Sequence, residues 1–166
     1  TNKILFQPNI STKIILNSQF STSSNIARFD QLNNIDSSDF PQFSEWSYGP
    51  QNRLLNVLSF SQISNNSIFD NVTLNFSHQF IEESRITRKF NNRYQDNRIE
   101  KVNILGSHIQ LSKSINSRTK IIYGSETYHN HVNSSAFSLN ILNNDSSNIS
   151  PRYPSGGGRT FFTALY

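Results

Sequence analysis

The sequence lacks cysteine and methionine entirely, and alanine occurs only three times among its 166 residues. Without cysteine there can be no disulfide framework, no thiolate nucleophile and no cysteine-ligated metal site. Charged residues make up 16% of the chain and hydrophobic residues 34%, both less than in an ordinary globular domain. No apolar run approaches the roughly 18 residues of a transmembrane helix, and no N-terminal signal peptide is visible.

Asparagine and serine dominate instead, with 50 residues between them, alongside 18 isoleucines and 13 phenylalanines. Simple disorder combines low hydrophobicity with high charge and few aromatic residues, so this composition argues against it. A chain poor in alanine and rich in isoleucine and phenylalanine is not a helical bundle. The length suits one domain. Composition therefore predicts an all-β protein with long polar loops.

Period-two alternation is the strongest local pattern. Val72, Leu74, Phe76 and Phe80 occupy alternate positions with His78, and polar residues stand between them. Such alternation is typical of a strand with one apolar and one wet face. Residues 14–20 repeat the pattern more briefly. No window of useful length shows helical periodicity.

The connections between the expected strands alternate in length. Short turn-like links occur near residues 65–67 and 116–118, whereas residues 31–52 and 133–158 are long, polar stretches. Residues 91–97 are expected to cap a hairpin with arms at about 72–90 and 98–114. The expected architecture is thus an antiparallel up-and-down meander with long loops on one side and short turns on the other.

Two architectures fit this meander. In a bacterial outer-membrane barrel, short periplasmic turns alternate with longer extracellular loops, and alternation directs apolar side chains into lipid. In a soluble β-sandwich, the same alternation packs one sheet against another. Four large polar residues on the opposite face favour the water-filled lumen of a barrel: Asn17, Gln19, Asn75 and Gln79.

Four segments resemble one family, in order and with approximately matching spacing. Residues 43–51 (FSEWSYGPQ) resemble the AEWYYGPQ segment of TonB-dependent outer-membrane receptors. Residues 21–30 (STSSNIARFD) are similar to that family's STSSDIPRYDRL, and residues 80–90 (FIEESRITRKF) to its QKIEESRIxRKF. The fourth segment, Arg152-Tyr153-Pro154 with Gly156-Gly157 and a final TALY, resembles RYPDGG…YALY.

This resemblance implies a segment of a large transmembrane β-barrel of about 22 strands with an N-terminal plug. Residues 1–166 would be a partial barrel without the plug, carrying about six strands and three outer loops, and the opening at Thr1 favours an excised piece. The whole protein would import a scarce nutrient, such as an iron-siderophore or haem, across the outer membrane of a Gram-negative bacterium. Its partners would be outer-membrane lipid and lipopolysaccharide, and, through parts of the parent chain, the plug and TonB.

The candidate functional residues follow from this assignment. Residues of the outer loops expected to face a ligand are Trp46, Tyr48, Arg88, Arg93, Arg152 and Tyr153. Residues expected to face lipid are Val72, Leu74, Phe76 and Phe80. Arginines and lysines also gather at residues 85–98, where they could contact lipopolysaccharide phosphates or capture an anionic ligand. Few aromatic residues interleave with them, so nucleic acid is not an expected partner.

Catalysis, a metal and a cofactor are not expected. His129 and His131 share a strand face and could ligate a metal or haem iron, but the sequence indicates no third ligand. No G-x-S-x-G elbow is present. The alternative function, of a different class, is a secreted or cell-surface adhesion or binding module built as a β-sandwich.

Overall fold

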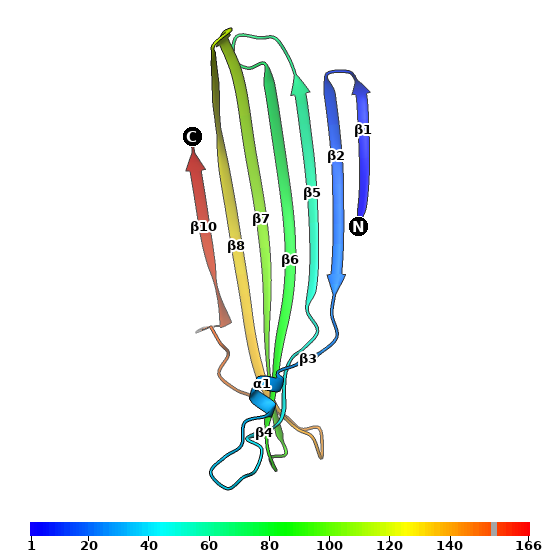
Figure 1. Cartoon of the computed structure of the whole chain (residues 1–166), viewed down its shortest axis with the longest axis vertical. Helices are drawn as coiled ribbons and strands as arrows, with labels where there is room; N and C mark the ends of the chain where they lie inside the picture. Colours follow the sequence, from blue (N-terminus) through cyan, green and yellow to red (C-terminus); the bar gives the residue numbers. More distant parts are fainter. Residues whose placement is uncertain (154–155) are drawn as a thin grey trace.

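One antiparallel sheet forms almost the whole molecule in the computed structural model, which describes residues 1–153 and 156–166 (Figure 1). Strand residues account for 71% of the chain and helix for 3%. The strands along its main path are β1 (Asn2–Asn9), β2 (Thr12–Thr22), β5 (Asn52–Ile63), β6 (Asn71–Lys89), β7 (Tyr94–Asn116), β8 (Thr119–Asn140) and β10 (Gly157–Leu165), in that order. The prediction of an all-β, up-and-down antiparallel meander is confirmed.

The remaining elements gather at one end of the sheet. The connection from β2 to β5 contains β3 (Ile26–Ala27), the single-turn helix α1 (Phe29–Leu32) and β4 (Phe43–Tyr48), and β4 adds to the outer end of β6. Strand β9 (Ser146–Asn148) pairs with the end of β8. We call this the loop end; it lies at the bottom of Figure 1, opposite the turn end with the short hairpins.

Asparagine side chains shape two turns at the turn end. The backbone N–H of Ser11 donates to Asn9 Oδ1 at 2.9 Å, and that of Arg118 donates to Asn116 Oδ1 at 2.9 Å. A short polar side chain that bonds to the backbone two residues on mimics a backbone turn. The 64–70 connection is held differently, because Lys113 Nζ donates to Asp70 Oδ1 at 2.7 Å and to the Asn66 carbonyl at 2.6 Å.

Strands β7 and β8 are longer at the loop end than the sequence predicted, whereas the predicted arm at about 72–90 matches β6. Residues 94–97 continue β7 and residues 133–140 continue β8, and the two strands pair through to Tyr94 and Asn140. Only Phe90 to Arg93 remain between β6 and β7, and Asn91 lies there at φ 55°. The polar Ser and Asn of residues 133–140 read as a loop in isolation, yet all eight residues pair with β7, and residues 137–139 also pair with β9 on the other side.

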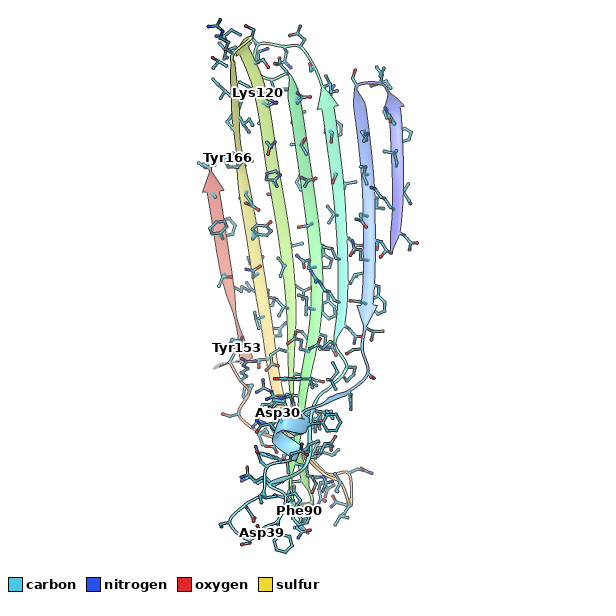
Figure 2. All side chains as sticks on the ribbon, in the orientation of Figure 1. Asp30, Asp39, Phe90, Lys120, Tyr153 and Tyr166 are labelled. Atoms are coloured by element: carbon cyan, nitrogen blue, oxygen red, sulfur yellow. The ribbon has the colours of Figure 1, made fainter. Side chains whose placement is uncertain are left out.

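The sheet is a single layer and is not closed, with β1 and β10 at its edges. Side chains stand on both faces of the ribbon in Figure 2, and within the described residues no second sheet covers either face. The largest side chains are accordingly exposed, with Phe20 at 64% and Phe76 at 52%. The inter-sheet core of a β-sandwich is therefore not what this chain forms. No helix in the described part is long and apolar enough to cross a membrane.

Cross-strand register divides the side chains between two faces. Phe76 lies opposite Leu58 of β5, which lies opposite Leu16 of β2 and, beyond it, Ile4 of β1. Neighbouring rows on this face, which we call face A, add Phe6, Ile14, Phe20, Leu54, Phe60, Leu74, Phe80, Ile109 and Leu111. The opposite face, face B, carries Asn17, Gln19, Asn75 and Gln79, as the alternation predicts, together with Leu55, Ile81, Val102 and Ile104.

Candidate functional site

Arg28, the residue before helix α1, connects two segments of the loop end. Arg28 directly precedes α1, and its Nε donates to Asp30 Oδ1 at 2.6 Å. The same guanidinium donates through Nη1 to the Tyr48 hydroxyl at 2.9 Å. Arg28 thereby joins the start of the 23–51 connection to β4, two segments that the sequence separates by twenty residues.

Trp46 and Tyr48 project from alternate positions of β4, and their rings meet edge to face at 85° with centroids 5.3 Å apart. Register places Tyr48 opposite Arg85 of β6 and Trp46 opposite Thr87. Gly49 ends β4 by donating its N–H to the Ser84 carbonyl at 2.8 Å. A side chain at position 49 would overlap that of Ser84, so this close approach requires glycine.

Two guanidinium groups share these two rings. The Arg28 Cζ lies 4.7 Å from the Trp46 ring centroid and 5.6 Å from that of Tyr48. The Arg85 Cζ lies 5.4 Å and 5.5 Å from the same centroids. All four distances fall within the range of cation–π attraction, about 6 Å. We call Arg28, Trp46, Tyr48 and Arg85 the arginine–aromatic cluster.

The two arginines of the cluster differ in their electrostatic partners. Asp30 neutralises Arg28, and this ion pair holds the pKa of the Asp30 carboxyl well below its usual range and raises the pKa of Arg28. Arg85 has no carboxylate within ion-pair distance in the described part of the chain, and its Nε is shielded from solvent without a hydrogen-bond partner. The cluster therefore carries one uncompensated positive charge beside two aromatic faces, a combination that suits an anionic or aromatic ligand.

The other predicted ligand-facing residues lie in separate local pairs. Arg88 Nη1 donates to the Asn92 carbonyl at 3.2 Å, and Arg93 stacks 5.2 Å from the Tyr94 ring, which follows it in sequence. Arg152 lies 5.9 Å from the ring centroid of Tyr153, and both side chains are exposed. Pro154, part of the fourth resembling segment, lies outside the described residues.

Of the six predicted ligand-facing residues, only Trp46 and Tyr48 belong to the cluster. Arg85 belongs to the basic stretch 85–98 that the sequence predicts could capture an anionic ligand, whereas Arg28 was not predicted to bind one. Arg28 carried a usable signal, because Asp30 follows two residues later and stands at the first turn of a helix. For Arg85 the signal was the basic stretch around it, but its contact with Tyr48 could not be foreseen, since it depends on how β4 pairs with β6.

The four predicted lipid-facing residues all lie on face A. Phe76 is exposed, while Leu74 and Phe80 are half-buried between neighbouring strands. Val72 differs, because it is only 8% exposed. It follows the 64–70 connection, which Lys113 of β7 and Tyr123 of β8 hold by hydrogen bonds to its backbone carbonyls.

His129 and His131 share face A of β8, as their spacing predicts, opposite Leu105 and Asn103 of β7. Among the described residues, no group of three or more His, Cys, Asp or Glu side chains is placed to hold a metal ion.

Comparison of the chain with family models, with curated proteins and with solved structures found no match in any of the three.

Proposed function

We propose that this chain is a segment of a transmembrane β-barrel, part of a TonB-dependent receptor that imports a scarce nutrient across the outer membrane of a Gram-negative bacterium. The observation that carries the proposal is face A. Exposed apolar side chains form contiguous rows across β1, β2, β5 and β6, and no second layer in the described residues covers them. In water such a surface is unfavourable, whereas acyl chains bury it without cost to the backbone hydrogen bonds.

The dimensions of these rows support a membrane-spanning role. Residues 72–80 of β6, nine in number, carry the apolar alternation, and the paired segments 54–62 of β5 and 12–20 of β2 match them in length. A tilted transmembrane strand needs about 9–11 residues. Beyond these nine-residue segments, β6, β7 and β8 continue to the loop end. In the proposed barrel, this extension lies outside the bilayer, on the side of the extracellular loops.

Both unpaired edges fit a segment of a larger closed sheet. β1 and β10 each leave a row of backbone N–H and C=O groups without a strand partner in the described residues. Within a membrane such an edge requires a neighbouring strand, since lipid cannot satisfy it. In the proposed receptor, those neighbours are further strands of the parent chain.

In this proposal, the arginine–aromatic cluster binds the ligand. Arg85 and Tyr48 share face B with Gln79, the face that lines the lumen of the proposed barrel. An anionic nutrient that arrives from outside would meet the free charge of Arg85 at the mouth of the lumen, beside two rings on which a planar group can stack. Nothing in this assignment requires a catalytic residue.

Reconstitution of the 166-residue chain tests the membrane assignment. In phosphatidylcholine vesicles, we expect slow amide hydrogen exchange over residues 72–80 and 103–111 and fast exchange over residues 31–42, which lie at the loop end outside the bilayer. Without lipid or detergent, we expect precipitation through face A. A soluble monomer that melts cooperatively without lipid would instead favour the binding-module alternative.

The ligand assignment has a separate test, because Trp46 is the only tryptophan. Haemin, an anionic planar molecule, serves as the probe. We expect it to quench Trp46 fluorescence in vesicle-bound chain, with binding weakened in Arg85→Gln and unchanged in Arg118→Gln, which removes an exposed arginine at the turn end. Equal effects of the two substitutions would remove the cluster from the proposal.

A further inference from the structure

A group of basic side chains borders the apolar rows on face A, at their loop-end side. His131 of β8 lies directly opposite Arg159 of β10 and, on its other side, opposite Asn103 of β7. Asn103 in turn lies opposite Phe80, one of the last residues of the apolar rows. The next row toward the loop end contains Lys101. We call His131, Arg159 and Lys101 the basic belt.

The charges of the basic belt are only partly compensated. Lys101 Nζ lies 3.2 Å from Glu82 Oε2, the carboxylate directly opposite it on β6. Arg159 is exposed on the edge strand and makes no ion pair within the described residues. Its neighbour His131 adds an imidazole whose N–H can donate to an anion. The belt therefore offers several donors on neighbouring positions of one face, with a net positive charge.

Apolar side chains lie next to the basic belt on its turn-end side. The face therefore has a charged part beside an apolar part, as a lipid molecule does. One row nearer the turn end, His129 lies opposite Phe161 and Leu105 on the same face. Phe161 is 71% exposed and Leu105 56% exposed. A small free anion would make no use of these apolar neighbours, whereas the acyl chain of a lipid held at the belt would lie directly along them.

We propose that the basic belt binds the phosphate of an anionic lipid headgroup. The proposal rests on the membrane assignment above, because it requires face A to lie against lipid. The guanidinium of Arg159 presents a fork of N–H donors that matches phosphate oxygens. His131 donates beside it, and Lys101 contributes from the adjacent row. The belt thus marks the depth at which the apolar rows end and the headgroups begin.

Vesicle binding tests this proposal with the whole 166-residue chain. Binding is measured by Trp46 fluorescence and co-sedimentation in pure phosphatidylcholine and in phosphatidylcholine with phosphatidylglycerol. A basic residue near an anionic surface contributes about 1 kcal/mol, or about fivefold in binding. We expect His131→Gln with Arg159→Gln to weaken binding to the anionic vesicles about five- to tenfold, with unchanged binding to pure phosphatidylcholine.

Three further arms make the result decisive. Arg53→Gln with His108→Gln removes the same two residue types from face B, and should leave the anionic preference intact. Arg159→Lys keeps the charge and should retain most of the preference. Inorganic phosphate at millimolar concentration should not compete.

Each contrary result has a distinct meaning. If both double variants lose the preference equally, net charge rather than the belt is responsible and the proposal fails. If inorganic phosphate displaces the vesicles, the belt is a free-phosphate site. If the chain binds phosphatidylcholine but the belt variant loses nothing, the belt proposal fails while the membrane assignment stands. If no vesicle is bound, both fail.

Discussion

The two ends of the sheet differ in how their side chains are stabilised. At the loop end, the chain packs on itself: Ser47, Ser134, Ala136, Ser138 and Asn140 are buried, and the arginine–aromatic cluster joins three segments. In the rest of the sheet, the described residues that are buried are Val72 and Ser112, while Phe6, Phe20 and Phe76 are each at least half exposed. The loop end therefore covers part of its own surface, whereas the apolar rows in the middle of the sheet are covered by no second layer in the described residues.

The largest predicted effect comes from a charge placed in the middle of face A. Phe76→Arg should lower the free energy of unfolding of the vesicle-assembled chain by about 2–4 kcal/mol, the cost of an arginine near the bilayer midplane. Asn75→Arg, on the adjacent position but facing the other way, should cost far less. Denaturant titration in vesicles measures both. Equal losses would show that the two faces do not differ in environment.

A smaller effect is expected when a side chain is introduced at a glycine that lies against an aromatic ring. Gly106 lies directly opposite Tyr128, and a side chain at position 106 would overlap the Tyr128 ring and the Ser77 hydroxyl. Gly106→Val should therefore destabilise the sheet by about 1–3 kcal/mol through overpacking. Gly158→Val is the control, because a side chain there meets nothing within 4 Å. The comparison is contradicted if valine is tolerated equally at both positions.

Loss of the tryptophan ring should affect the loop end alone. Trp46→Leu removes the surface on which both cluster arginines stack, at a cost of about 0.5–1 kcal/mol for each exposed cation–π contact. Faster amide exchange should appear over residues 26–48 and not over residues 72–80. Tyr94→Leu removes a ring that makes one cation–π contact in the described part of the chain, with Arg93, and should give a smaller change. Equal acceleration in both regions would mean that the two ends are not independent.

The smallest of the predicted effects is the loss of loop-end stability in acid. Because Arg28 lowers the pKa of Asp30 in the folded chain, the ion pair contributes stability above the unfolded carboxyl pKa, about 3.9. That stability is lost as the pH falls from about 4 through the lowered pKa. Amide exchange of residues 28–33 should therefore accelerate in acid in the wild type. In Asp30→Asn it should already be faster at neutral pH and should change less with acid.

The extent to which the sequence predicts this fold follows from how local each signal is. The alternation of residues 72–80 is contained within one strand, so it assigns Phe76 and Asn75 to opposite faces correctly. The cluster is not local: Tyr48 meets Arg85 only because β4 adds to the outer end of β6. The extension of β8 through residue 140 also escapes prediction, because serine and asparagine side chains give no strand signal, and it is pairing with β7 along the whole extension that holds the backbone.

The surroundings of residues 72–80 decide the central claim, and the absence of cysteine makes them accessible to measurement. Single substitutions to cysteine along this segment, each carrying a nitroxide label in vesicles, can be compared for collision with lipid-dissolved oxygen and with a water-soluble nickel complex. We predict oxygen to dominate at positions 74, 76 and 80 and nickel at positions 73, 75 and 79. Equal accessibility to both quenchers at adjacent positions would contradict the account.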